Sequence, residues 1–313
     1  MTYNRHKAVH ALHLIPSCTH SSLAKQLSRG GTAHSHYNMR STILPPLGSP
    51  FQTPLPQEGH EIRAETPTMC EEATDIVKYG NPLTMDRLFI GLEPAWSGIN
   101  AIEFTEHMPI SFVSKLVTTR GNIPKMDCFK RTSHRHLVNL KEVFVAEESL
   151  MLFYDKWEGI SLKEIQDLRP AFQLGEVEVA TICFQMLQAL QYIHGTLGIN
   201  HGALCGEDIY IQESGDIKIA KIGESMAREF HPQEKSKDIR SILKIARQLL
   251  GLRGTSGGRG TLGLLVHDFT AAPPNTTVDQ LLQHPLMRFN AGPWCLRPIN
   301  LLCTLARTRC IST

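Results

Sequence analysis

The chain has 313 residues, of which 42% are hydrophobic and 20% charged, with a formal net charge of +2. This composition supports a folded core and excludes a wholly disordered chain. No run approaches the roughly 18 consecutive apolar residues of a membrane-spanning helix, and the start lacks the apolar block of a secretory signal. The eight cysteines form no C-x-x-C pair, so we expect neither a zinc site nor a disulfide framework, and we expect reduced, intracellular thiols.

The charge is unevenly distributed along the chain. The first 57 residues contain no Asp or Glu but five Lys or Arg, whereas residues 58–313 hold 27 basic and 30 acidic side chains. The leading segment is also rich in Ser, Thr, Pro and Gly, which predicts a disordered basic tail over residues 1–70. A mitochondrial transit peptide is the alternative, because such leaders are also free of acidic residues. The charges are too sparse to favour nucleic-acid binding.

Strand patterns dominate residues 85–162. Short alternating or β-branched runs, separated by turn residues, predict five strands. They cover 85–92, 100–104, 111–117, 137–145 and 149–154. The last two are expected to form a hairpin closed by the acidic turn 146–148. A helix is expected over 125–133, between the third and fourth strands.

A helical period takes over after residue 160. It predicts three amphipathic helices, and two short strands are expected between the first helix and the second. The helices cover 179–193, 238–250 and 276–284, and the strands 208–211 and 216–220. The last helix has Thr276 or Thr277 as its N-cap and is followed by Pro285. Residues 291–313 are expected to form a C-terminal tail, in which 294–313 is either a short extra helix or a loose segment. The sequence therefore predicts an α+β, two-lobe fold with a small β-rich N-lobe (71–157) and a helical C-lobe (158–290).

Five motifs follow one another in this body of the chain. HGALCGEDIYI (201–211) is followed by two short strands and then by KIG (221–223). SHRHLV, SKDIRSI and LLQHPL begin at Ser133, Ser236 and Leu281. In this order and spacing the motifs resemble those of the eukaryotic protein kinases, with the first over the H-R-D-L-x-x-x-N catalytic loop and KIG in the place of D-F-G. The resemblance spans 85–290 and implies a protein kinase-like fold.

The positions that carry phosphoryl transfer in that family have changed. Ala203 stands where the resemblance implies the Asp that accepts the proton of the substrate hydroxyl, and Cys205 replaces the loop Lys. Lys221 replaces the D-F-G Asp, which holds Mg²⁺. Asp208, at the position of the second metal ligand, is the remaining candidate for a metal. The resemblance thus implies that no catalytic residue is intact and that Mg²⁺ is not expected.

The candidate nucleotide-binding residues come from the small lobe. Gly91 and Gly98 flank GLEPAWSG (91–98), at the place of the Gly-rich loop, and Lys115 of FVSK corresponds to the V-A-I-K lysine. The acidic partner of that lysine would fall near Lys125 or Asp127. Asp155 completes the set, which leaves ATP as a candidate cofactor.

Architectural residues are retained. The resemblance implies that His201 and Asp238 hold the catalytic loop to the central helix, while Gly223 keeps its turn. Asp238 follows Lys221 by only 17 positions, about half the usual activation segment, and no A-P-E motif follows.

Three hypotheses of function follow. The first is an inactive pseudokinase that binds and regulates a protein partner, with no nucleic-acid or membrane partner, in the cytoplasm or nucleus. The second is an atypical ATP-dependent protein serine/threonine kinase with weak activity, which would use Asp208, Glu207 or Glu224 for metal. The third is no kinase relation: a helical interaction domain with a small sheet, or a decayed reading frame.

Overall fold

The computed structural model describes residues 76–95, 98–118, 124–146, 149–167, 174–228, 234–251, 263–273 and 275–311. The predicted N-terminal tail (1–70) and most of the turn 146–148 lie outside the described residues.

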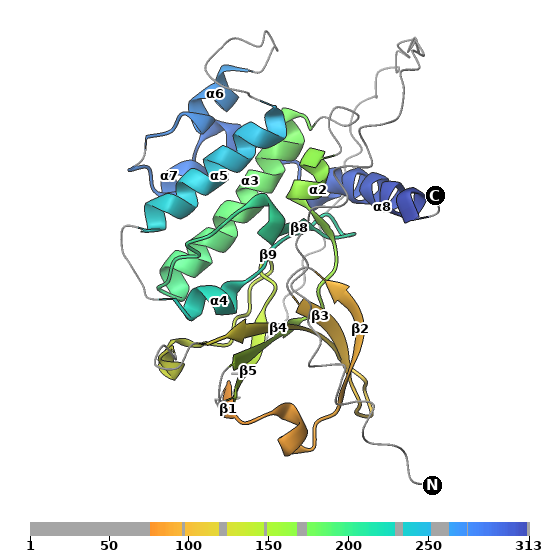
Figure 1. Ribbon diagram of the computed structural model, residues 1–313. Helices are drawn as coiled ribbons and strands as arrows, with labels where there is room; N and C mark the ends of the chain where they lie inside the picture. Colours follow the sequence, from red (N-terminus) through yellow and green to blue (C-terminus); the bar gives the residue numbers. More distant parts are fainter. Residues whose placement is uncertain are drawn as a thin grey trace, which may run out of the picture. The chain divides into compact units, whose positions relative to one another are not determined.

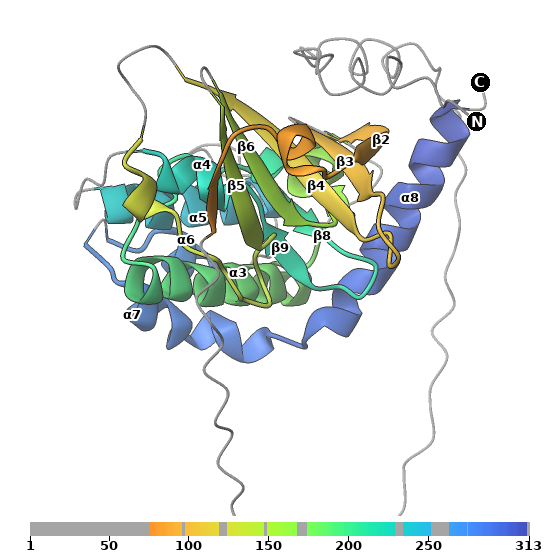
Figure 2. The same ribbon diagram turned by 90° about the horizontal axis from the view of Figure 1, so that it is seen from below.

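The first lobe is a six-stranded sheet with the spatial order β1-β5-β6-β4-β3-β2 (Figures 1 and 2). Its strands are β1 (Val77–Tyr79), β2 (Phe89–Ala95), β3 (Gly98–Glu103), β4 (Ile110–Val117), β5 (Leu140–Ala146) and β6 (Ser149–Asp155). The five predicted strands and the β5–β6 hairpin are confirmed. The first predicted strand (85–92) corresponds to β2 and begins only at Phe89, because Pro82–Met85 forms a 3-10 turn capped by the side chain of Asn81.

Alternation divides the side chains of this sheet between two faces. Val113 faces outward with Phe89, Ala101, Phe144 and Phe153 in a small cluster of their own. The other face carries cross-strand rows, one of which joins Asn100, Phe112 and Tyr154. Phe112 and Tyr154 belong to the large core that continues into the second lobe, so this inner face borders the space between the lobes.

The helix predicted over 125–133 is wrong. Only Met126–Cys128 forms a 3-10 turn there. The backbone N–H of Thr132 donates to the Leu140 carbonyl, and the Thr132 hydroxyl accepts from the Leu140 N–H. At Thr132 the segment therefore forms its hydrogen bonds with β5, so these groups are not available for the hydrogen bonds of a helix. Among the described residues no longer helix joins β4 to β5.

The second lobe is mainly helical (Figure 1). Its helices are α2 (Leu162–Asp167), α3 (Glu176–Gln191), α4 (Ile222–Met226), α5 (Lys235–Leu250), α6 (Leu264–Thr270), α7 (Val278–Leu282) and α8 (Arg297–Ile311). Three short strands, β7 (Ile160–Ser161), β8 (Ile209–Ile211) and β9 (Ile217–Ile219), pair antiparallel. The predicted helices and strands correspond to α3, β8, β9, α5 and α7, with Thr277 as the N-cap of α7. The α+β, two-lobe, kinase-like arrangement is confirmed.

The predicted C-terminal tail contains an ordered helix, α8. Ile299, Asn300 and Cys303 are buried, and the Asn300 amide donates to the Ile211 carbonyl over 2.7 Å. Arg307 pairs with Glu164 of α2. These contacts make α8 a part of the second lobe. None of the helices that the structure describes has the length and apolarity to cross a membrane.

The chain enters β5 through a segment that is bonded to β9. Val138 N–H donates to the Ile219 carbonyl, and Ile219 N–H donates to the His136 carbonyl. The buried ring of His136 reaches the Ile217 carbonyl from Nδ1 over 3.2 Å. This bridge ties the first lobe to the second.

Acidification is expected to weaken this bridge. Burial lowers the pKa of His136, and its bond to Ile217 only partly opposes that effect. A folded pKa below the unfolded value of about 6.5 means that the stabilisation is complete above the unfolded pKa and is lost progressively as the pH falls from there through the folded pKa. Urea unfolding across this range should show a steeper loss in the native chain than in His136→Asn, which keeps a donor near Ile217 but does not titrate. Parallel pH profiles of the two proteins would contradict the prediction.

Candidate functional site

The loop 201–208 is fixed by one buried carboxylate. Asp238 of α5 accepts hydrogen bonds from the backbone N–H groups of His201 and Gly202, both over 2.8 Å, and lies 2.9 Å from Nε2 of His194. The His201 ring contacts the Ala220 carbonyl over 2.9 Å. Gly202 has a φ of +75°, which glycine adopts without strain. The structure thus joins His201 and Asp238 as a rigid support for this loop.

Asp208, at the end of this loop, forms an ion pair with Lys221, which follows β9. The ammonium of Lys221 lies 2.7 Å from Oδ1 of Asp208, whose side chain is only 4% exposed, against 35% for Lys221. Lys221 has a left-handed backbone (φ +61°), which costs a non-glycine residue roughly 1–2 kcal/mol. Burial alone would lower the pKa of Lys221, but the charge of Asp208 and the hydrogen bond to it prevail and raise it. The lysine is therefore a permanent cation beside Asp208.

These residues do not fit a magnesium ion. Mg²⁺ binds through carboxylate oxygens in a near-octahedral shell and is repelled by an ammonium group. One of the two expected ligand positions is Lys221, and its cation already neutralises the other, Asp208. Within the described residues no three His, Cys, Asp or Glu side chains gather as metal ligands.

Neither Ala203 nor Cys205 offers a proton acceptor for an alcohol. Ala203 is exposed and carries only a methyl group. The Cys205 thiol donates to Oδ2 of Asp208 over 3.0 Å. Burial, followed by this bond to Asp208, raises the pKa of Cys205 to about 11, so the thiol stays protonated at neutral pH. Cys205 therefore supports Asp208 and cannot act as a base.

Glu224 of α4 crosses from the second lobe to the sheet. Its carboxylate accepts from the Ser114 hydroxyl over 2.8 Å and from the Tyr154 hydroxyl. Burial, followed by the negative charge of Glu224, raises the pKa of Tyr154 well above its ordinary value, so the phenol remains a donor. A Cβ on Gly223 would lie 2.7 Å from the Tyr154 oxygen, so glycine allows α4 to approach the sheet this closely.

Lys115 points away from this cleft. Neighbouring residues on a strand face opposite sides, and here Ser114 bonds to Glu224 while Lys115, exposed, is opposite Met151 on the outer side. Among the described residues no ion pair joins Lys115 to Asp127. Lys125, the other position expected for an acidic partner, is positively charged and cannot pair with Lys115. The geometry therefore does not favour Lys115 as a nucleotide contact, and Ser114 occupies the place that the motif assigned to it.

The other candidate nucleotide residues are dispersed. Gly91 packs against Ile99, whereas Gly98 lies against the ring of Phe112 on the inner face. The Asp155 carboxylate binds Lys141 over 2.8 Å and Asn139 over 3.1 Å, beside β5. Of the four predicted residues, only Gly98 is placed at the inner face of the sheet.

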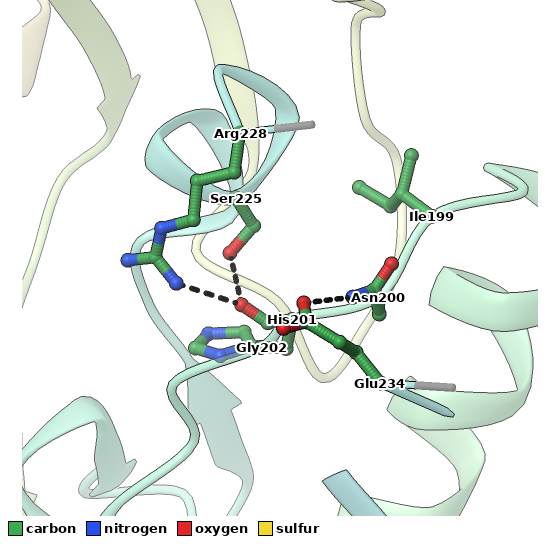
Figure 3. Close-up of a pocket in the computed structure, with 7 residues that line it drawn as sticks. All are labelled: Ile199, Asn200, His201, Gly202, Ser225, Arg228 and Glu234. Atoms are coloured by element: carbon green, nitrogen blue, oxygen red, sulfur yellow. Dashed lines mark hydrogen bonds between the residues drawn. The ribbon is translucent and has the colours of Figure 1, made fainter. Parts of the chain in front are cut away.

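A small pocket lies behind the loop, between His201 and α4 (Figure 3). Its volume of about 10 Å³ is the room that one water molecule needs. The His201 carbonyl accepts from Ser225 and Arg228, and Asn200 donates to Glu234. These polar groups satisfy one another, so the pocket is a structural feature without room for a nucleotide.

Comparison with known proteins agrees with the motifs and the fold. Residues 116–243 match the model of the protein kinase domain. This part of the chain is therefore similar to the kinase domain of the eukaryotic protein kinases. The matched region contains the loop, the Asp208–Lys221 pair and most of α5. The assignment of Ala203, Cys205 and Lys221 to catalytic positions rests on the motifs alone.

The relatives are serine/threonine and other protein kinases. The chain is 32% identical to serine/threonine-protein kinase dst2 of Dictyostelium discoideum, over 33% of this chain and 9% of that protein. It is 29% identical to sperm motility kinase Z of Mus musculus, over 36% of this chain and 22% of that protein. It is 32% identical to serine/threonine-protein kinase 10 of Danio rerio, over 32% of this chain and 10% of that protein. The aligned part is thus a small fraction of each relative's length.

Several residues of this kinase domain's cleft are absent from the sequence-based candidates. Ser114, Tyr154 and Asn100 were not identified, and Glu224 entered only as an alternative metal ligand. The sequence did contain one signal for Asn100 and Ser114. Each is a polar residue at an inward-facing position of a strand whose other inward-facing residues are mostly apolar.

Proposed function

We propose that this kinase domain is a catalytically inactive pseudokinase that acts by binding a protein partner. The ion pair between Lys221 and Asp208 carries the proposal, because it fills the metal position with a covalently attached cation. Ala203 adds to it, since the alcohol of a substrate would have no proton acceptor.

The expected loss of rate is large. General-base catalysis typically contributes about 10²–10⁴-fold, and protein kinases turn over at about 1–100 s⁻¹. The absence of the base alone would lower the rate to roughly 10⁻⁴–1 s⁻¹. The loss of metal, which neutralises the developing charge on the transferred phosphoryl group, lowers it further.

Phosphotransfer is the direct test. The full chain, incubated with γ-labelled ATP and Mg²⁺ or Mn²⁺, is expected to label neither itself nor a generic protein substrate above the background of a mock purification. Asp208→Leu is the matched control, because it removes the remaining candidate ligand with little change of volume, whereas Asn is itself the metal ligand of the family at this position. Labelling by the native chain that Asp208→Leu abolishes would overturn the proposal and favour the atypical kinase.

We propose that the domain acts by binding a protein partner, because the packed kinase-like fold is retained although the catalytic side chains are replaced. The supports of the loop and the cores of both lobes are fully packed, whereas Ala203 and Lys221 have lost their roles. We place this action inside the cell, in the cytoplasm or nucleus, since the described cysteines are free thiols.

Substitution of Lys221 by Asp is expected to create a dependence on Mg²⁺. Without metal, Lys221→Asp leaves two carboxylates together and should destabilise the chain by roughly 1–3 kcal/mol, a value discounted for the partial exposure of the lysine. Mg²⁺ at 100 times its Kd would return about 2.7 kcal/mol. The measurement is urea unfolding with and without millimolar Mg²⁺.

Lys237→Asp is the control for this prediction. Lys237 pairs with Glu234 on the surface, so its replacement also sets two carboxylates side by side, but both remain accessible to water. The native chain and Lys237→Asp should show no response to Mg²⁺. A response of the native chain equal to that of Lys221→Asp would show that Lys221 does not replace the metal.

A further inference from the structure

The link between the lobes is bonded to a side chain of the sheet. Residues 156–159 connect β6 to β7, outside either sheet. The side-chain amide of Asn100 donates from Nδ2 to the Trp157 carbonyl over 3.1 Å, and its Oδ1 accepts from the Trp157 N–H over 3.3 Å. One carboxamide thus satisfies both backbone groups of Trp157. Asn100 is only 5% exposed, so the pair of bonds is shielded from water.

The space beside these bonds is filled by aromatic rings. The ring of Phe112 lies between Tyr154 and Trp157, with centroid distances of 6.0 and 6.4 Å. A Cβ on Gly98 would lie 2.6 Å from the Phe112 ring, so β3 rests directly on it. Phe112, Tyr154 and Trp157 are all buried. Phe112 is therefore enclosed between the sheet and the link that leads to the second lobe.

A kinase that uses ATP needs this region for the nucleotide base. The phosphates of ATP lie beneath the Gly-rich loop and beside the metal-binding Asp, so the base must lie further along the cleft, toward the link. The adenine edge offers an amino donor beside a ring acceptor, which is the same pair that a carboxamide offers. The backbone N–H and C=O of Trp157 can pair in the same way with the adenine edge or with a carboxamide.

We infer that Asn100 and Phe112 occupy the base-binding region as an internal substitute for adenine, so that this chain does not bind a nucleotide base at the link. Asn100 takes the hydrogen-bonding edge and Phe112 takes the volume of the ring. Glu224, bonded to Ser114 and Tyr154, holds the second lobe against the same face. This inference rests on the proposed function in one respect: it takes the region between the lobes to correspond to the nucleotide site of an active kinase.

The native chain provides the first test. The chain has three Trp residues, so selective ¹⁵N-Trp labelling yields few backbone amide signals, and Trp157→Phe assigns the one from Trp157. Millimolar ATP or adenosine, with and without Mg²⁺, is expected to leave this resonance in place. A saturable shift of the Trp157 amide would overturn the inference. Such binding without phosphotransfer would still leave the proposed function standing, so the two failures are distinguishable.

The second test opens the region by mutation. Asn100→Ala combined with Phe112→Ala removes both the amide and the ring, and adenosine binding is measured by isothermal calorimetry. The matched control combines Phe112→Ala with Asn300→Ala, because Asn300 is also buried (8% exposed) and also donates to a backbone carbonyl, but on α8. The first protein is expected to bind adenosine at least tenfold more tightly than the control.

The other outcomes contradict the inference. Equal affinity of the two double variants would show that the amide of Asn100 does not compete with a base. No binding by either variant, with both folded by circular dichroism, would show that the region is not a base site. If the cavity prevents folding, the labelled native chain decides the question.

Discussion

Asp238→Ala should lower the free energy of unfolding by about 3–5 kcal/mol, because the buried backbone N–H groups of His201 and Gly202 lose their charged acceptor. Asp238 is 1% exposed, so water cannot replace the carboxylate without an opening of the loop. Urea denaturation followed by circular dichroism gives the value. Hydrogen exchange at the His201 and Gly202 amides should accelerate in the same variant.

A second Asp–His pair serves as the control for Asp238. Asp268 lies 3.1 Å from His284, but its side chain is 76% exposed. Asp268→Ala removes an Asp–His contact of the same type without leaving a buried donor, so a change of at most about 1 kcal/mol is expected. Equal effects of the two substitutions would show that Asp238 contributes only its contact with His194 and does not support the loop.

Gly215→Ala is the second substitution with a large expected effect, about 2–5 kcal/mol of lost stability. Gly215 has a φ of +84°, and a Cβ there would lie 1.8 Å from the backbone carbonyl oxygen of Pro293. The β8–β9 turn thus packs against the segment that leads into α8. Because the obstacle is backbone, the methyl group must displace the whole connection.

Gly198→Ala separates the two contributions. Gly198 has a similar φ of +70°, but no atom lies within 4 Å of its Cβ position. Its replacement should cost only the backbone strain, roughly 1–2 kcal/mol. Thermal unfolding of both variants isolates the clash with Pro293. If Gly215→Ala is no less stable than Gly198→Ala, the contact between the turn and residue 293 is not tight in solution.

The helices and strands of this kinase domain could be predicted from the sequence where the apolar residues followed a single spacing, either that of a strand or that of a helix. The alternation in β4 and β6 and the helical period of α3 and α5 each buried a continuous apolar face, so their existence and type followed. The helix over 125–133 did not form because its hydrogen bonds go to β5, a long-range pairing that local periodicity does not show. The C-terminal helix α8 was left open because its burial depends on Ile211, distant in sequence.

The candidate site followed from the sequence only in part. The changes at Ala203, Cys205 and Lys221 could be identified by motif, but the direct contact of Lys221 with Asp208 depends on the fold. The FVSK motif suggested Lys115, whereas the strand register turns Ser114 inward instead, since a shift of one residue reverses the face. The bond of Asn100 to Trp157 spans 57 positions and carries no local signal.

The pairing of Asp208 with Lys221 also constrains how this lineage can change. Any single replacement of Lys221 by a residue other than Arg leaves Asp208 with an uncompensated charge, and the variant must tolerate that loss before a metal ligand at 221 gives any advantage. On the proposed function, catalysis would further require a carboxylate at 203. Each such intermediate would be less stable than the present chain without yet being more active, so selection on stability alone would keep the domain in its present form.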